Sequence, residues 1–235
     1  MGKDSSSNTT LYPYSPIDGQ IKKLECDEYY KQIEAVNGHL FAFTRDSIKV
    51  SDDGVMWSKI SFPTIYDEIT QNNEYTPECM LYDGKDYIVS GGGNFIVSSP
   101  DLTEWSFISD DPYGTACSYG IASGGGKVVI VGDHLYLSFR SEDNLWSFDE
   151  KINNVESIPD YYTLCLFDVA TDGSKFIAVG QRGLILVRDG DIWNVSDSGV
   201  GDWLNKIVWN GKYFVVLSEK GFLFSKDGQT WSSVK

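Results

Sequence analysis

The stretch Ser225-Lys-Asp-Gly-Gln-Thr-Trp231 decides the fold, because four other versions of it occur earlier in the chain. They are Ser51–Trp57, Ser99–Trp105, Ser141–Trp146 and Val187–Trp193, and we number the five copies as boxes one to five in chain order. In each, a Trp follows a turn that contains Asp and, in most copies, Gly. The Trp-to-Trp spacings are 48, 41, 47 and 38 residues. Repeats of this length, made of short strands, are typical of propeller blades.

The segment before each box predicts three further strands. In the fourth repeat the expected strands are residues 167–171, 175–179, 184–187 and 192–195. Asp172-Gly173 and Asp189-Gly190 separate two pairs of these apolar runs, and Asp-Gly is a strong hairpin signal. We therefore predict an all-β fold, a five-bladed β-propeller of four-stranded antiparallel blades that forms one domain over residues 28–235. For residues 1–27 two interpretations stand: a polar N-terminal tail, or a segment that helps to close the ring.

The boxes resemble the Asp-box (BNR) repeat, whose pattern is Ser-x-Asp-x-Gly-x-x-Trp on the turn between the third and fourth strands. Box two has Leu102 and Thr103 where Gly is expected, box three is one residue short, and box four has Val187 in place of Ser. The superfamily includes sialidases and many non-catalytic bacterial and phage propellers. The resemblance therefore implies the propeller fold and leaves the function open.

The box residues are expected to have structural roles. The Asp should accept backbone N–H groups within its own turn, and the Trp ring should cover the sheet edge and pack against the next blade. The residues assigned to this role are Asp53, Trp57, Asp101, Trp105, Asp143, Trp146, Asp189, Trp193, Asp227 and Trp231.

Composition excludes several classes of protein. The 34 acidic and 19 basic residues give a net charge of -15, which argues against nucleic-acid binding and against adhesion to anionic membranes. No apolar run is long enough to predict a membrane span, and the N-terminus lacks the apolar stretch of a signal peptide. The four Cys have no CxxC spacing and no neighbouring His, so we expect buried free thiols, no metal site and no cofactor.

Function is expected on the loops of one face. The linkers between blades carry many carboxylates and also Tyr161, Tyr162 and Trp203, which predicts either a solvated surface or a face that recognises sugars or cationic partners. The turns between second and third strands should surround the mouth of the axial channel. Their candidate ligand-binding residues are Asp46, Asn94, His134, Arg182 and Lys220.

Two enzyme classes, sialidases and glycoside hydrolases, need particular residues that can be sought in this sequence. A sialidase needs a cluster of arginines, whereas this chain has four Arg in all, of which Arg140 and Arg188 are expected away from the channel mouth. A glycoside hydrolase needs carboxylates that act as acid and base, and Glu78, Asp168 and Asp202 are the candidates. First-strand carboxylates in propellers often bond to backbone instead, so no residue is assigned a catalytic role.

The sequence thus favours a non-catalytic recognition or scaffold propeller that binds a glycan or a protein through its inter-blade loops. A glycoside hydrolase is the alternative hypothesis. Because the N-terminus lacks an apolar stretch, the protein is expected to be made in the cytoplasm without a signal peptide. The resemblance to phage-associated repeats implies a role in a larger assembly, such as a phage tail or a bacterial surface complex.

Overall fold

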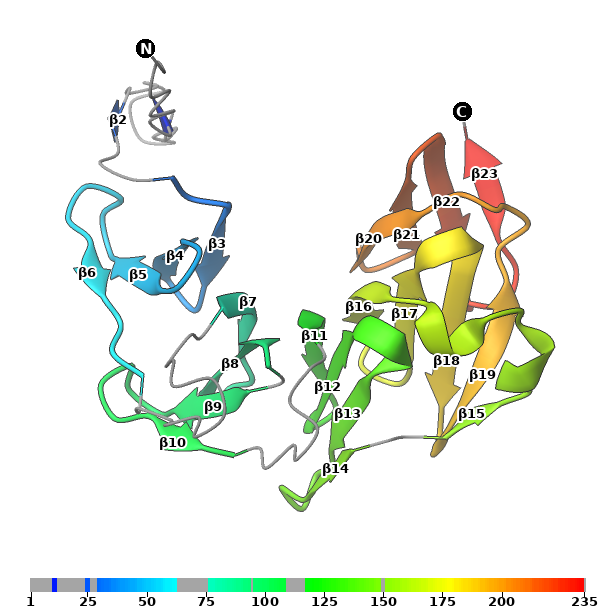
Figure 1. Ribbon diagram of the computed structural model, residues 1–235, viewed down its shortest axis with the longest axis horizontal. Coiled ribbons are helices and arrows are strands. Elements are labelled where there is room, and N and C mark those ends of the chain that lie inside the picture. Colours follow the sequence, from blue (N-terminus) through cyan, green and yellow to red (C-terminus); the bar gives the residue numbers. More distant parts are fainter. Residues whose placement is uncertain are drawn as a thin grey trace, which may run out of the picture. The chain divides into compact units, whose positions relative to one another are not determined.

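The structure is a computed structural model that describes residues 10–11, 24–25, 29–62, 76–93, 95–108, 117–148 and 151–234 (Figure 1). The regular elements in these ranges are β-strands and four single-turn 3-10 helices. The chain divides into two compact units, Met1–Pro77 and Glu78–Lys235. The expectation of one domain over residues 28–235 therefore stays a prediction. So does the ring-closing role of residues 1–27, of which only the two-residue strands β1 (Thr10–Leu11) and β2 (Leu24–Glu25) are described.

Apart from the two-stranded β1–β2 sheet, five sheets follow one another along the described part of the chain, and we number them 1 to 5. Sheet 1 lies in the first unit and consists of β3 (Gln32–Val36), β4 (His39–Phe43), β5 (Ile48–Ser51) and β6 (Ser58–Lys59). Sheet 2 consists of β7 (Thr76–Tyr82), β8 (Tyr87–Gly92), β9 (Ile96–Ser99) and β10 (Ser106–Phe107). Sheet 3 consists of β11 (Ser118–Gly124), β12 (Lys127–Gly132), β13 (Leu137–Arg140) and β14 (Trp146–Phe148).

Sheet 4 consists of β16 (Leu166–Thr171), β17 (Phe176–Gly180), β18 (Leu184–Asp189) and β19 (Ile192–Asp197). A short fifth strand, β15 (Ile152–Asn153), pairs in parallel with the outer edge of β19. Sheet 5 consists of β20 (Leu204–Trp209), β21 (Phe214–Ser218), β22 (Gly221–Ser225) and β23 (Ser232–Val234). The predicted plan of four strands per repeat is confirmed.

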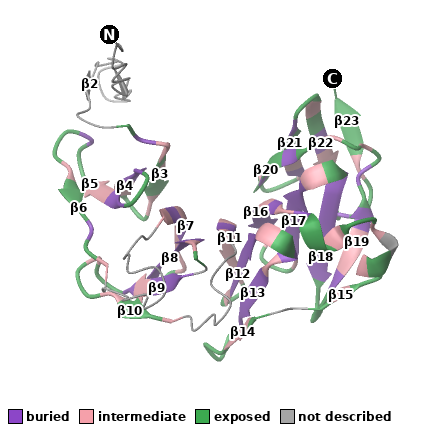
Figure 2. Cartoon of the chain, in the orientation of Figure 1, coloured by how far each residue is buried: buried purple, intermediate pink, exposed green. Residues whose placement is uncertain are grey.

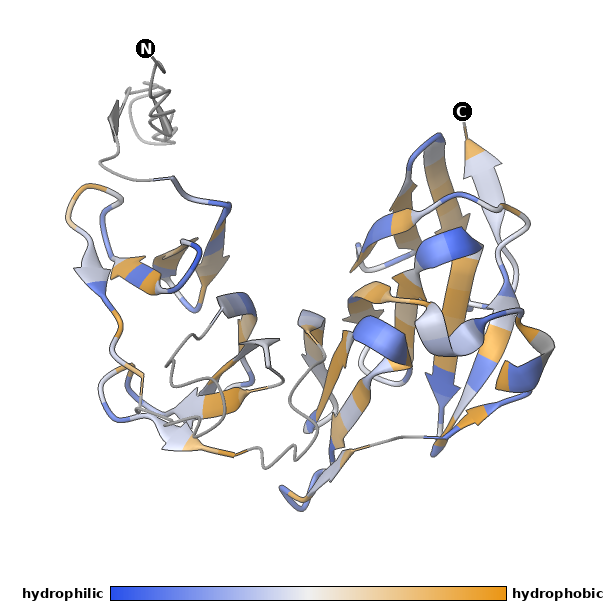
Figure 3. Ribbon diagram, in the orientation of Figure 1, coloured by the Kyte–Doolittle hydropathy of each residue, from blue (hydrophilic) through white to orange (hydrophobic). Residues whose placement is uncertain are grey.

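The second strands of sheets 2 to 4 are buried along nearly their whole length (Figure 2), and their residues are mostly apolar (Figure 3). In β17, residues from Phe176 to Val179 are at most 3 % exposed, so the strand is covered on both faces. Such a strand reads as a continuous apolar run rather than an alternating one. Apolar side chains from sheets 3 and 4 form one core cluster, and those from sheets 4 and 5 form another.

The first strands of neighbouring sheets come into close contact, with β16 lying beside both β11 and β20. Gly120 in β11 is required by this approach, because a Cβ there would meet the Cα of Asp168 at 2.6 Å. The carboxylate of Asp168 in turn accepts the backbone N–H of Ile207 at 2.8 Å. A small residue and a buried acid thus join three successive sheets.

Boxes one, two and five form the same turn. In box one, Oδ1 of Asp53 accepts the N–H groups of Val55 and Met56 at 2.8 and 2.9 Å, while the Trp57 ring N–H donates to the carbonyl of Gly54 at 3.2 Å. Asp101 and Asp227 accept the equivalent pairs in boxes two and five. These backbone hydrogen bonds lower the pKa of Asp53 and Asp227, and they lower the pKa of Asp101 to about 2.

In boxes four and five the Trp does not pack in the expected direction. The Trp231 ring N–H donates to Oγ of Ser196 at 3.3 Å, and the ring packs on the core that includes Ile177 and Val187. Those residues belong to sheet 4, which precedes the sheet of Trp231. Trp193 likewise belongs to the core cluster that sheet 4 shares with sheet 3. The box turn reaches backward because Gly228 lies against Ile177, where a Cβ would come within 2.4 Å of the Ile177 Cδ1.

The box carboxylates predict a specific pH dependence. Asp227→Ala should lower the thermal unfolding midpoint at pH 7, because two backbone N–H groups lose their acceptor. A carboxyl whose pKa is lowered by folding stabilises the protein above its ordinary pKa, and this contribution is lost as pH falls through the folded value. The difference between wild type and variant, measured by circular dichroism, should therefore shrink below pH 4.

Asp143→Ala is the matched control. In the described residues of the box three turn, Asp143 accepts no such pair of N–H groups, and Oγ of Ser141 takes the N–H of Leu145 instead. If Asp143→Ala and Asp227→Ala lower the thermal unfolding midpoint equally, the role given to Asp227 is wrong.

Candidate functional site at the turns of sheets 3 to 5

The turns between second and third strands hold two residues in an unusual backbone conformation. His134 has φ 54° and ψ 35°, and Arg182 has φ 54° and ψ 34°, both in the left-handed region. Non-glycine residues adopt it uncommonly, and sheet 2 has Gly93, with φ 77°, at the corresponding position. The chain thus has non-glycine side chains at two positions where glycine would be unstrained, and both side chains are exposed.

Of the other predicted turn residues, Lys220 and Asp46 lie at the same position of their repeats, and Asn94 lies outside the residues that the structure describes. Lys220 follows β21 and is exposed, with its ammonium paired to Asp202. Asp46 occupies the equivalent turn of sheet 1, where it accepts a hydrogen bond from the Thr44 hydroxyl at 3.2 Å. It belongs to the first unit. Asn94 lies outside the described residues, as do the acidic linkers over residues 63–75 and 109–116.

The linker between sheets 3 and 4 brings four predicted residues together. It contains the 3-10 helices η2 (Val155–Ser157) and η3 (Tyr161–Thr163). The N–H of Leu135, next to His134, donates to the carbonyl of Leu164 at 2.9 Å. The guanidinium of Arg182 lies 3.8 Å from Asp160. Tyr161 and Tyr162 follow Asp160, so their helix lies between the turns that carry His134 and Arg182.

The two tyrosines differ in exposure. Their rings meet edge to face at 5.8 Å. Tyr161 packs on the core between sheets 3 and 4, whereas Tyr162 is 62 % exposed. Tyr162 is therefore the one whose ring faces solvent and is free to contact a partner.

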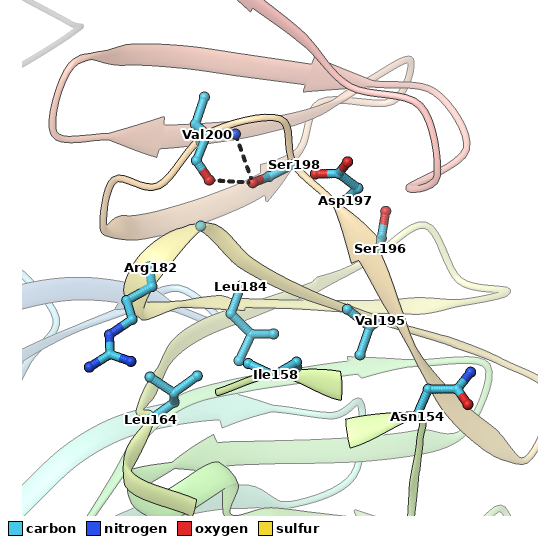
Figure 4. A pocket seen from close by; sticks show the side chains of 11 residues that line it. Asn154, Ile158, Leu164, Arg182, Leu184, Val195, Ser196, Asp197, Ser198 and Val200 are labelled. Carbon is cyan, nitrogen blue, oxygen red and sulfur yellow. Dashed lines mark hydrogen bonds between the residues drawn. The ribbon is translucent and has the colours of Figure 1, made fainter. Parts of the chain in front are cut away.

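A half-open pocket of about 460 Å³ lies beside this cluster (Figure 4). Apolar side chains of Ile158, Leu164, Leu184 and Val195 form its walls. Its polar lining residues are Asn154, Arg182, Ser196, Asp197 and Ser198. The linker of residues 151–164 thus forms one wall, and the end of β19 forms the opposite wall. Polar and apolar side chains thus share the lining, and more of its accessible surface is polar than apolar.

Trp203 lies in a row of aromatic side chains that sequence analysis missed. Its ring is 5.5 Å from Phe167, which is 6.2 Å from Tyr119. Tyr119 and Phe167 occupy the extra residue of a bulge at the start of β11 and β16, and β20 has the same register shift. Bulges redirect side chains near functional sites. Aligning the first strands of the repeats would have placed Tyr119 and Phe167 at one position.

The carboxylates proposed for glycoside cleavage are engaged elsewhere. The Asp168 side chain is 6 % exposed and binds the Ile207 N–H and the Lys206 ammonium, the latter at 3.3 Å. Burial raises its pKa, but the group faces the next sheet and not solvent. Asp202 pairs with Lys220. Glu78 is partly buried in β7.

None of Cys165, Arg140 and Arg188 lines the pocket. Cys165 donates to Oδ1 of Asp133 at 3.0 Å, and burial together with that carboxylate raises the pKa of its thiol to about 11. Arg140 and Arg188 are buried between sheets. Within the described ranges, no group of three or more His, Cys, Asp or Glu side chains gathers closely enough to hold a metal ion. No helix of the described residues is long and apolar enough to cross a membrane.

Solved structures resemble this chain over nearly its whole length. The GH74 xyloglucanase of Xanthomonas campestris matches with a TM-score of 0.71 and 14% identity over 96% of this chain and 42% of that chain. The WD40 repeats of RRP9 match with a TM-score of 0.65 and 6% identity over 96% of this chain and 73% of that one. YCF48 bound to D1 peptide matches with a TM-score of 0.58 and 12% identity over 88% and 70%.

The chain has a β-propeller fold. At these identities the likeness shows the fold alone, and the chain spans less than half of the xyloglucanase. No protein-family model and no curated protein sequence matches the chain significantly. The Asp-box resemblance therefore stays a prediction, although the turns of boxes one, two and five have the hydrogen bonds expected for it.

Proposed function

We propose that this propeller is a non-catalytic recognition module that binds a segment of a partner protein at the turns of sheets 3 to 5. The observation that carries the proposal is the pocket of about 460 Å³ beside Arg182, with a mixed polar and apolar lining and the exposed Tyr162 nearby. Rigid strands hold these short turns, so little conformational entropy is lost on association. One propeller of similar fold, YCF48, has been solved with a bound peptide, and another similar structure is a nidogen–laminin complex.

A glycoside hydrolase is the weaker hypothesis. The xyloglucanase shares the fold, but a retaining or inverting mechanism needs two carboxyl groups that face a common substrate. Asp168 is covered by sheet 5 and Asp202 is held by Lys220. A glycan ligand for the non-catalytic module stays the alternative to a protein segment, because exposed Tyr and Trp rings also suit sugars.

The test compares a peptide array with a glycan array. Labelled wild-type protein should bind a subset of immobilised random peptides, and Arg182→Ala or Tyr162→Ala should abolish that binding. Leu145→Ala is the matched control, because Leu145 is 70 % exposed in the box three turn, away from the pocket. Binding to glycans alone, or peptide binding that the pocket variants leave unchanged, would contradict the proposal.

A ring of five blades is part of the same proposal. Val208, Leu217 and Phe222 of sheet 5 are 50 %, 44 % and 47 % exposed, so one face of this sheet is apolar and uncovered within the second unit. The second strands of sheets 2 to 4 are covered on both faces, and a closed ring would cover β21 in the same way.

Phe222→Ala tests this closure. If the face is covered, the variant should lose about 1.5–3 kcal/mol of unfolding free energy, the value of burying a Phe side chain. Leu145→Ala, in the box three turn and 70 % exposed, should change little. Urea unfolding measures both, and equal small effects would mean that the face stays in solvent. Membership of a larger assembly, such as a phage tail, follows only from the resemblance of the repeats and is proposed on that basis.

A further inference from the structure

The aromatic row of Tyr119, Phe167 and Trp203 follows the first strands of sheets 3 to 5, which lie side by side in the second unit. Tyr119 and Phe167 are half-buried, whereas Trp203 is 45 % exposed, and no other Trp of the described residues is equally exposed. The row adjoins the turn between the second and third strands of sheet 4, because the Gly183 N–H donates to the carbonyl of Asp202 at 2.7 Å. It therefore ends in an exposed ring beside the candidate site.

A carboxylate lies at each end of the row. Oε2 of Glu219 accepts the backbone N–H of Trp203 at 3.4 Å, and the Glu219 N–H donates to the Trp203 carbonyl at 3.2 Å. At the other end, Asp133 accepts the Tyr119 hydroxyl and, at 3.0 Å, the Cys165 thiol. These donors are uncharged, so they leave the negative charge of both carboxylates in place.

The neighbouring lysines are paired with other acids. Lys206 lies 3.3 Å from Asp168, and Lys220, although it is attracted by the adjacent Glu219, bonds to Asp202. Among the described residues, no Lys or Arg lies within ion-pair distance of the carboxylates at the two ends of the row. No described cation lies over a ring of the row either. The surface thus combines aromatic rings with negative charge that an incoming cation would neutralise.

Arginine is the side chain that matches both features at once. Its guanidinium is planar and stacks on an aromatic face, while the N–H groups at its edge donate to a carboxylate. A Lys ammonium is a compact, strongly hydrated charge and makes poorer use of a ring face. A neutral sugar would stack on the rings but would leave both carboxylates uncompensated. Charge complementarity therefore favours arginine.

From these observations we infer that the aromatic row is a binding site for an arginine-bearing segment of the partner protein. The guanidinium lies over the exposed face of Trp203 and donates N–H groups to the Glu219 carboxylate. The methylene stem of the arginine lies along the rest of the row. This inference rests on the proposed function, because it names the chemistry of the segment that the recognition module holds.

NMR of the indole N–H groups tests the inference. The seven Trp give seven indole signals, and the signal absent from Trp203→Phe belongs to Trp203. Three peptides are compared: (Gly-Arg)4, (Gly-Lys)4, and (Gly-Arg)4 with citrulline in place of each Arg, which keeps the shape and removes the charge. In about 0.15 M salt, (Gly-Arg)4 should shift the Trp203 signal and the citrulline peptide should not. The Lys peptide should bind at least about threefold more weakly than the Arg peptide.

Fluorescence anisotropy with labelled (Gly-Arg)4 measures what each group contributes. Trp203→Leu should weaken binding about tenfold and Glu219→Gln about threefold. Trp203→Phe keeps an aromatic face and should retain most of the affinity, which separates the role of the ring from a general effect of substitution. Glu104→Gln is the matched control, because it removes the same charge from an exposed position in the box two turn and should change the affinity little.

Four results would each overturn the inference: no shift of the Trp203 signal with (Gly-Arg)4, equal binding of the Arg and citrulline peptides, equal affinity for the Arg and Lys peptides, or equal affinity of Trp203→Leu and wild type. A glucose oligosaccharide that shifts the Trp203 signal where the Arg peptide does not would make the row a sugar site instead. The proposed function has its own readout in the peptide array. If array binding depends on Arg182 while (Gly-Arg)4 leaves the Trp203 signal unmoved, the protein partner stands and the arginine site is wrong.

Discussion

Asp83→Ala should lower the free energy of unfolding by about 3–5 kcal/mol, the cost of leaving a buried ion-pair partner alone. The side chains of Asp83 and Arg140 are 5% and 8% exposed, and their ion pair joins sheet 2 to sheet 3 across 57 residues of sequence. Asp83 also accepts the N–H groups of Lys85 and Asp86 at 2.8 and 2.7 Å. Removing the carboxylate thus leaves the Arg140 guanidinium buried without its acid.

The pH dependence of this effect follows from the pKa of Asp83. Burial raises it, but the backbone N–H groups and Arg140 together lower it below the ordinary value. The stabilisation is therefore complete above the unfolded pKa and is lost as pH falls through the folded value. Guanidinium unfolding of wild type and Asp83→Ala should give a large difference at pH 7 that narrows at pH 3.

The double variant Asp83→Leu, Arg140→Met is the control. Replacing both members of a buried pair with apolar side chains is often nearly neutral, so the double variant should be more stable than Asp83→Ala. If Asp83→Ala alone costs less than about 1 kcal/mol, as exposed pairs do, the pair is not buried in solution.

Trp193→Ala should also cost about 3–5 kcal/mol, because the ring leaves a cavity in a packed core. Trp193 is 0% exposed and lies between sheets 3 and 4. Trp193 differs from the box one, two and five Trp residues in one respect: its ring N–H has no hydrogen-bond partner in the described structure. Box four lacks the Ser and closes with a two-residue turn, so the Trp falls inside β19 and its N–H misses the turn carbonyl.

Trp193→Phe keeps an aromatic ring at this position and removes the ring N–H group. Loss of an unsatisfied buried donor offsets part of the lost packing, so this variant should stay within about 1 kcal/mol of wild type. Trp231→Phe should cost more, because the Trp231 N–H donates to the Gly228 carbonyl at 3.0 Å. Chemical denaturation of the three variants measures how much unfolding free energy each substitution costs. A Trp193→Phe loss larger than that of Trp231→Phe would mean that the Trp193 N–H is satisfied in solution.

The strands and box turns could be predicted because their signals are local. Asp172-Gly173 separates β16 from β17, and each box Asp bonds to N–H groups two and three residues later in boxes one, two and five. Short-range hydrogen bonds of this kind depend little on what packs against the turn. Box four shows the limit, since the same Asp-Gly pair there forms a tighter hairpin that buries Trp193.

The candidate site was predicted only in part. The repeat phase placed His134, Arg182 and Lys220 at equivalent turns, and the structure has them there. It also brings Tyr161 and Tyr162 between two of these turns, which no local pattern indicated. The sequence did not reveal the aromatic row of Tyr119, Phe167 and Trp203, because two of its members lie on bulges that shift the strand register.

The sequence by itself determined the number of repeats, the strands within each and the acidic character of the linkers, because these depend on residue spacing and composition alone. Tertiary structure decided which side chains meet: the Asp83–Arg140 pair, the backward packing of Trp193 and Trp231, the burial of Asp168 and the pocket beside β19. Each of these joins residues from different sheets. Their contacts depend on how one sheet packs on the next, which the local chemistry of either segment does not specify.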